Sequence, residues 1–204
     1  MKKSTTLDDI LKRLRAIQLE VEQELDRLLA EKRKQFNYTL HRGKVVFERN
    51  IRRLHHTQRI ASWRYIWNAP LRHIFSAPVV YGMIIPLSFL DVSITLYQQI
   101  CFRIYKIPLV RRKDHIIIDR HHLAYLNNIQ KLNCIYCGYI NGLIAYAREI
   151  IARTEQFWCP IKHALCTQGT HQRSEKFVDY GDSKAWRDQL INIREDWDNN
   201  DSSM

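Results

Sequence analysis

Four residues in the second half of the chain have the types and the spacing of metal ligands. Cys134 and Cys137 form a CIYC pair, and Cys159 and His163 follow further along as CPIKH. Three thiolates and one imidazole fill all four positions of a tetrahedral zinc ion, which is typical of a structural rather than a catalytic site. The pattern therefore predicts a zinc knuckle in the C-terminal half.

Two alternatives stay open for this knuckle. Cys166 lies close enough in the sequence to replace His163 as the fourth ligand. An all-cysteine set would admit iron or an iron–sulfur cluster, because both are bound by thiolates alone. We therefore predict Cys134, Cys137, Cys159 and His163 as ligands of zinc, with Cys166 as the alternative ligand.

A second set of polar residues has the types needed for acid–base chemistry. Asp119, His121 and His122 lie in a DRHH turn, and Glu149 lies between the two cysteine-containing pairs. A neutral imidazole beside a carboxylate suits proton transfer. The simpler interpretation is helix capping by Asp119 and an ion pair from Glu149 to Arg153, four residues later. We prefer it, because no nucleophile motif or phosphate-binding loop accompanies these residues in the sequence.

One part of the chain resembles a family of uncharacterised bacterial proteins. The residues that carry the resemblance are IDRHHLAYLNNIQKLNCIYCGYINGLIAYAREIIARTEQFWCPIKHA, and it extends back through LYQQICFRIYKIP. The first 60 residues lie outside it. The resemblance implies a bacterial source and a shared role for Cys134, Cys137, Cys159 and His163, but it implies no activity or substrate.

The basic residues of the chain are concentrated in its first part. The chain has 32 Lys and Arg against 21 Asp and Glu, a net charge of +11. Residues 1–113 contain 22 basic and 9 acidic side chains, against 10 and 12 in residues 114–204. This asymmetry predicts an anionic partner for the first part, either phospholipid headgroups or nucleic acid.

An apolar segment favours the phospholipid partner. Residues 78–102 carry Asp91 as their one formal charge and approach the length of a membrane-spanning helix. Pro86 interrupts the segment, polar residues recur at helical spacing after it, and both flanks are basic. We therefore predict an apolar helical hairpin that lies in the membrane surface or re-enters it, with its polar stripe buried against protein. A true span and a soluble core helix are the alternatives, and Asp91 is predicted to pair with a nearby basic residue.

Arginine and aromatic residues precede this segment. Trp63, Arg64, Tyr65, Trp67 and Arg72 are closely interleaved. Such residues suit the headgroup level of a bilayer, where aromatic rings meet both water and hydrocarbon and Arg pairs with phosphate. The same composition suits RNA or single-stranded DNA, which is why nucleic acid is kept as an alternative partner.

The chain opens with an amphipathic helical pattern. Its apolar residues follow a heptad repeat, so this helix is expected to pack on a partner, either a second copy or another part of the same chain. The residues in the repeat are Leu7, Ile10, Leu14, Ile17, Val21 and Leu28.

These observations predict a mainly α fold in four parts. They are N-terminal coiled-coil helices at 1–60, a basic-aromatic and apolar membrane-associated segment at 61–113, a small zinc-knuckle helical module at 114–175 and a polar tail at 176–204. One short strand is expected at 116–118. The predicted function is that of a zinc-binding protein with a scaffold or interaction role on the cytoplasmic face of the inner membrane. The alternatives are a membrane-bound enzyme acting on a lipid-linked or anionic substrate, and a nucleic-acid-binding protein.

Overall fold

The computed structural model describes residues 3–36, 38–41, 44–47, 49–165 and 169–197. The fold is mainly helical, as predicted, and includes one two-stranded hairpin. The chain divides into two units. The first holds residues 1–60 with 122–126, and the second holds residues 61–121 with 127–204.

The first unit begins with a long helix and continues into a β-hairpin. Helix α1 (Lys3–Gln35) has 33 residues, β1 (Tyr38–His41) pairs antiparallel with β2 (Lys44–Phe47), and α2 (Arg49–Thr57) follows. The hairpin corrects the prediction of helices throughout residues 1–60, since its strands contain the aromatic and β-branched residues that favour extended backbone.

The loop at 122–126 belongs to this first unit through its aromatic contacts. The rings of Tyr125 and His55 meet edge to face with centroids 5.2 Å apart. His55 in turn meets Phe47, with centroids 5.4 Å apart. These edge-to-face contacts hold the loop, β2 and α2 together.

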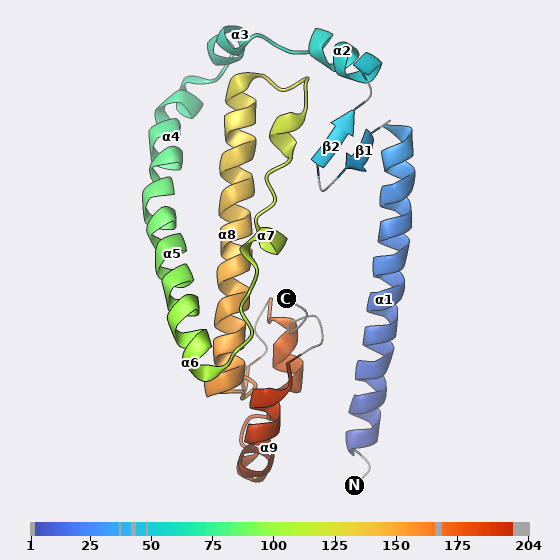
Figure 1. The fold of residues 1–204 in the computed structure, drawn as a ribbon, viewed down its shortest axis with the longest axis vertical. Helices are drawn as coiled ribbons and strands as arrows, with labels where there is room; N and C mark the ends of the chain where they lie inside the picture. The colour runs from blue at the N-terminus through green and yellow to red at the C-terminus, as the bar shows by residue number, and fades with distance from the viewer. Residues whose placement is uncertain (1–2, 37, 42–43, 48, 166–168, 198–204) are drawn as a thin grey trace. The chain divides into compact units, whose positions relative to one another are not determined.

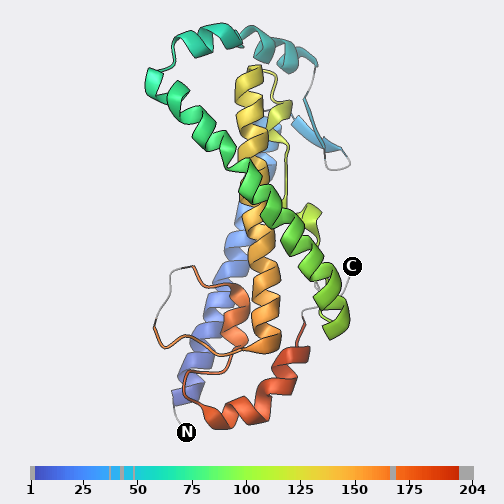
Figure 2. The same ribbon diagram turned by 90° about the vertical axis from the view of Figure 1, so that its left-hand side faces the viewer.

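The second unit begins with α3 (Ser62–Trp67) and a long helical rod. The rod consists of α4 (Leu71–Gly82), α5 (Ile84–Tyr97), the π turn η1 (Gln98–Phe102) and α6 (Arg103–Tyr105) (Figure 1, Figure 2). The hairpin predicted at Pro86 is not formed. Pro86 falls in the first turn of α5, where a residue without an N–H loses no helical hydrogen bond. The chain therefore continues in one direction after a single turn residue, Met83.

A second long helix, α8 (Asn128–Trp158), lies beside the rod and runs in the same direction (Figure 1). A capping box begins it: the Gln130 amide donates to Asn127 Oδ1 at 2.9 Å, and the Asn127 amide donates to Gln130 Oε1 at 3.0 Å. Further along, Tyr97 on α5 hydrogen-bonds Thr154 on α8 at 3.0 Å. Two parallel neighbours require a connection that travels back along their whole length.

That connection lies directly on α8. It contains α7 (Arg112–His115) and then an extended stretch at 116–118, where a strand was predicted but no strand partner is present among the described residues. The stretch packs instead on two glycines of α8. A Cβ on Gly142 would lie 2.6 Å from Ile116 Cα, and one on Gly138 would lie 3.2 Å from the Ile117 carbonyl oxygen.

The core of the second unit lies between the rod, the connection and α8. Its buried apolar residues are Phe102, Ile107, Val110, Leu143, Tyr146 and Ile150. A smaller cluster of Phe177, Val178 and Ile193 is formed by the chain around η3 (Gln172–Lys176) and by α9 (Ser183–Glu195). Apart from residues 122–126, the parts expected at 61–113, 114–175 and 176–204 thus lie within one unit.

The glycine contact gives a direct test of this packing. Replacing Gly142 with Ala should lower the free energy of unfolding by at least about 1 kcal/mol, because the new Cβ meets backbone atoms that cannot rotate away. This loss should exceed the gain of about 1 kcal/mol that Ala brings inside a helix. Chemical denaturation of the purified protein measures the difference.

Gly82→Ala is the matched control, since a Cβ at Gly82 meets nothing within 4 Å. It should leave stability unchanged or slightly raised. Equal stability of the Gly142→Ala variant and the wild-type protein would contradict the close approach of the connection to α8.

Candidate functional site

The rod has two chemically different faces, and the outward one is apolar. Its side chains recur every three or four residues through α5, η1 and α6, which places them on one side of the helix. They are between 56% and 75% exposed. The residues are Ile85, Phe89, Val92, Leu96, Ile100 and Ile104, and we call them the apolar stripe.

The exposure of this stripe separates the rod from a core helix. Among the described residues, Leu71–Tyr105 is the helix whose length and composition would suffice to cross a membrane. A core helix of a soluble protein can have the same length and apolar composition, but it is mostly covered by its neighbours. Only 6% of the most apolar part of the helix Leu71–Tyr105 is buried. The rod therefore presents most of its apolar surface outward.

The inward face of the rod is polar and faces α8 and the connection. Asp91 is 6% exposed. The Arg112 guanidinium donates to Asp91 Oδ1, and the Tyr139 hydroxyl donates to Asp91 Oδ2 at 2.7 Å. The prediction that Asp91 pairs with a nearby basic residue is confirmed, and its partner comes from the connection.

Gln98 makes the second polar contact of the inward face and is 2% exposed. Its side-chain oxygen accepts from the Val110 amide at 2.7 Å, and its nitrogen donates to the Val110 carbonyl at 3.3 Å and to the Tyr146 hydroxyl at 3.0 Å. One side chain thus satisfies both backbone groups of a buried residue that has no strand or helix partner.

Two groups that contact Asp91 have pKa values above their ordinary values. Burial raises the pKa of the Tyr139 hydroxyl above its ordinary value, and its hydrogen bond to Asp91 raises it further. The hydrogen bond to Asp91 likewise raises the pKa of Arg112. Both groups therefore stay protonated and continue to donate to Asp91 throughout the physiological pH range.

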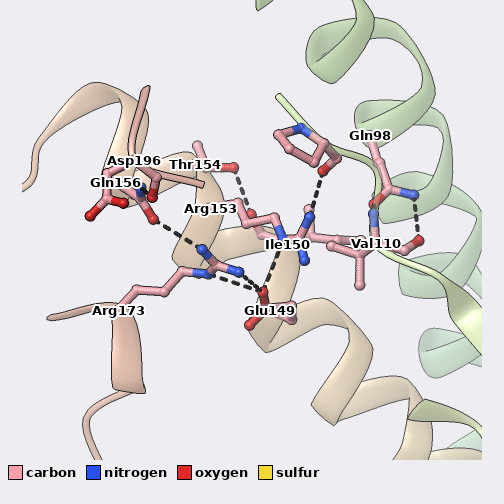
Figure 3. Close-up of polar contacts among 10 residues, drawn as sticks. Gln98, Val110, Glu149, Ile150, Arg153, Thr154, Gln156, Arg173 and Asp196 are labelled. Atoms are coloured by element: carbon pink, nitrogen blue, oxygen red, sulfur yellow. Dashed lines mark hydrogen bonds and ion pairs between the residues drawn. The ribbon is translucent and has the colours of Figure 1, made fainter. Parts of the chain in front are cut away.

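A third polar cluster lies near the carboxyl end of α8 (Figure 3). We call Glu149, Arg153, Gln156 and Arg173 the polar hub. Glu149 Oε1 accepts from Arg153 Nε at 2.9 Å and from Arg173 Nη2 at 2.7 Å. Arg173 Nη1 also donates to Gln156 Oε1 at 3.1 Å.

The polar hub holds backbone as well as side chains. Arg153 Nη1 donates to the Pro108 carbonyl at 2.8 Å, and Gln156 Nε2 donates to the carbonyls of Ile193 and Asp196, each at 2.9 Å. The hub therefore joins the connection, α8, η3 and the end of α9. The predicted pair of Glu149 and Arg153 is confirmed, but Arg153 is buried.

The structure does not bring the predicted metal ligands together. Cys134 and Cys137 lie within α8, whereas Cys159 follows its last residue. A continuous helix separates Cys137 from Cys159 by roughly 33 Å, at about 1.5 Å per residue. Among the described residues, no group of three or more His, Cys, Asp or Glu side chains converges as a metal site would require.

The second half of the predicted ligand set has a local explanation. The chain between Cys159 and His163 is extended and pairs with residues near Val178. The Val178 amide donates to the Pro160 carbonyl at 2.9 Å, and the Lys162 amide donates to the Val178 carbonyl at 2.8 Å. Both Cys159 and His163 are exposed. The alternative ligand Cys166 lies outside the described residues, and zinc or iron stays a prediction from the sequence.

The predicted acid–base residues are also spread out. The connection passes Gly138 just before Asp119 and His121. Glu149 lies eleven residues further along α8, roughly 16 Å away at about 1.5 Å per residue. His122 belongs to the first unit. Glu149, held by two arginines, therefore takes part in folding contacts, and the four residues do not form one site.

Two signals in the sequence could have indicated this arrangement. Asn127 and Gln130 have the spacing of a capping box, which predicts a helix that begins before the CIYC pair. Gly138 and Gly142 are four residues apart, the small-residue spacing that lets another segment approach a helix closely.

Aromatic and basic side chains lie exposed near the two ends of the rod. On α3, Trp63 and Trp67 are exposed, Trp67 by 85%. The guanidinium carbon of Arg64 lies 5.8 Å from the centroid of a Trp63 ring. Arg103 and Lys106 are exposed at the other end. The rod is thus bordered at both ends by residues suited to a polar interface.

No protein-family model, curated protein or solved structure matches this chain. The structure itself defines a helical unit with an outward apolar rod, an inward polar stripe and a buried polar hub. Its functional assignment therefore depends on the chemistry of these surfaces.

The raised pKa of Tyr139 predicts a pH dependence of stability. A group whose pKa is higher in the folded state stabilises the fold fully below its unfolded pKa of about 10 and loses that contribution as the pH rises through its folded pKa. The stability difference between wild type and Tyr139→Phe should therefore be constant at neutral pH and shrink above about pH 10. Denaturant titrations at several pH values measure it.

Phenolate absorbance supplies an independent control for Tyr139. The difference between wild-type and Tyr139→Phe titrations should have its midpoint above the ordinary tyrosine value. A midpoint at or below that value would contradict the buried contact with Asp91.

The polar hub predicts a large effect from a small change at Glu149. Glu149→Gln leaves two largely buried guanidinium groups without their carboxylate and should cost about 2–3 kcal/mol, somewhat less than a fully buried pair because Glu149 is partly exposed. Hydrogen exchange should increase chiefly in residues 172–176 and 183–195.

The control for this variant is the exposed ion pair of Lys162 and Asp179, whose atoms lie 2.8 Å apart. Asp179→Asn should change stability by less than about 0.5 kcal/mol. Similar small effects of both variants would show that the hub does not hold the C-terminal segment.

Proposed function

We propose that the protein is a bacterial membrane-associated interaction protein that lies on the cytoplasmic face of the inner membrane through α3 and the rod. The observation that carries this proposal is the exposed apolar stripe on a helix whose polar side chains are buried. In water, a continuous apolar surface along several helical turns would favour aggregation. Lipid provides the apolar medium that this face requires.

The dimensions of the rod favour a position along the membrane surface. Its 35 residues extend over roughly 52 Å at about 1.5 Å per residue, against a hydrocarbon core of about 30 Å. Basic residues lie near both ends: Arg64 before the rod, Arg72 in its first turn, Arg103 in its last turn and Lys106 directly after it. Because basic flanks favour the cytoplasmic side, both ends belong on that side.

The flanking residues suit an anionic bilayer. Trp63 and Trp67 are large amphipathic rings that fit the headgroup region, and Arg64 beside them suits lipid phosphate. The positive charge of residues 1–113 adds a long-range attraction to anionic lipids. Phosphatidylglycerol is therefore a suitable test lipid.

An interaction role is favoured over an enzymatic one by the placement of the polar residues. Asp91, Gln98 and Glu149 are each engaged by partners within the fold. Their hydrogen bonds hold separate segments of the chain together. The apolar stripe and the exposed face of α1, in contrast, stay open among the described residues.

Vesicle flotation tests the proposal. Phe89→Glu and Leu96→Glu should each lower the floated fraction at least about 10-fold, because burial of either apolar side chain contributes about 1.5–3 kcal/mol and the new carboxylate opposes insertion. Wild-type protein should float with phosphatidylglycerol-containing vesicles and more weakly with phosphatidylcholine alone.

Ile191→Glu is the matched control, since Ile191 is an equally exposed apolar residue on α9, away from the rod. It should float like the wild-type protein. Equal flotation of all three variants, or no flotation of wild type, would overturn the proposal. Salt-sensitive binding to RNA or single-stranded DNA without flotation would point to the nucleic-acid alternative.

A further inference from the structure

Helix α1 carries an exposed apolar face of its own. Ile17, Val21, Leu25 and Leu28 recur every three or four residues and are between 47% and 60% exposed. Within the first unit, α1 contacts β1, the strand that follows it directly in the chain. Most of this face therefore has no cover from the described part of its unit.

A long helix in water depends on packing along its apolar face. These residues continue the heptad spacing of Leu7, Ile10 and Leu14 earlier in the helix. The step from Val21 to Leu25 is four residues, where a regular heptad would have three. We propose that the partner of this face is α1 of a second copy of the chain, and that the two helices run antiparallel.

The charges of α1 select the antiparallel direction. Lys12, Arg13 and Arg15 form a basic block, and an acidic block follows at Glu20, Glu22, Glu24 and Asp26. In a parallel, in-register pair, each block would face its own copy and repel it. In an antiparallel pair, the basic block of one copy faces the acidic block of the other, and symmetry makes this contact twice.

The apolar positions agree with the same arrangement. An antiparallel pair centred near residues 17 and 18 places position 7 opposite Leu28 of the second copy. It also places position 10 opposite Leu25, and position 14 opposite Val21. The overlap from 7 to 28 extends over roughly 33 Å at about 1.5 Å per residue, which is about three heptads. In the same register, positions 13 and 15 lie opposite Glu22 and Glu20, so the central charges and the apolar pattern agree.

Sedimentation of the full chain in density-matched detergent tests the pairing. Val21→Glu should raise the dimer dissociation constant at least about 100-fold, because each dimer loses two buried apolar side chains. Leu19→Glu is the matched control: Leu19 is as exposed as Val21 but lies on the opposite side of α1. It should leave the dimer unchanged, and circular dichroism should show equal helix content in both variants.

Charge exchange tests the direction. Arg13→Glu with Arg15→Glu, and separately Glu20→Lys with Glu22→Lys, should each weaken the dimer at least about 10-fold, whereas all four together should restore it. A parallel pair predicts the opposite: little change in each homodimer, and preferential mixing of an exchanged chain with wild type. That result would overturn the antiparallel assignment.

A monomeric wild-type chain over the whole concentration range would overturn the proposal. So would equal effects of Val21→Glu and Leu19→Glu. The pairing does not depend on the proposed membrane role, because the stripe on the rod and the face of α1 are altered by different substitutions. Loss of dimer with normal flotation, or the reverse, separates the two.

Discussion

The close approach of the connection to α8 at Gly142 is the constraint on which the second unit depends. The rod and α8 run in the same direction, so the chain between them must return along their full length. A side chain at Gly142 would occupy the space of the Ile116 backbone. With glycine there, the connection lies against α8, and its carbonyl and amide groups come within reach of Gln98 and Arg153. Those two side chains replace the strand partners that an extended, buried segment otherwise needs.

This arrangement also determines which face of the rod is apolar. Asp91 and Gln98 point to α8 and the connection because their hydrogen-bond partners lie there, and burial of either without a partner would be costly. The apolar residues of the same helix, among them Phe89 and Leu96, then face outward. A soluble helix has the reverse arrangement, with its apolar face on the core. The inverted polarity is therefore the physical basis of the proposed membrane association, beyond the length and composition of the helix.

Much of the local structure could be predicted from the sequence, whereas the long-range arrangement could not. Residue types and short spacings predict the mainly helical class, the pairing of Asp91 with a basic residue and the ion pair of Glu149 and Arg153. The metal knuckle stays a prediction, because two ligand pairs of suitable spacing do not reveal whether the chain between them folds back or continues as a helix, and in the structure that chain is helix α8. The hairpin at Pro86 failed because a proline breaks a helix in its interior but is tolerated in its first turn.

The same contrast bears on function. Glu149 was a candidate for acid–base chemistry in the sequence, but in the structure its carboxylate accepts hydrogen bonds from Arg153 and Arg173. A carboxylate that accepts hydrogen bonds from two buried guanidinium groups is already engaged by the fold and is not positioned for proton transfer. The described part of the chain instead leaves two ordered apolar surfaces exposed, the stripe on the rod and one face of α1. Exposed apolar surface has no chemistry of its own, but it favours association. This is the basis on which we propose lipid as the partner of the stripe, on a rod bordered by basic and aromatic residues, and a second copy as the partner of α1, where blocks of opposite charge follow one another.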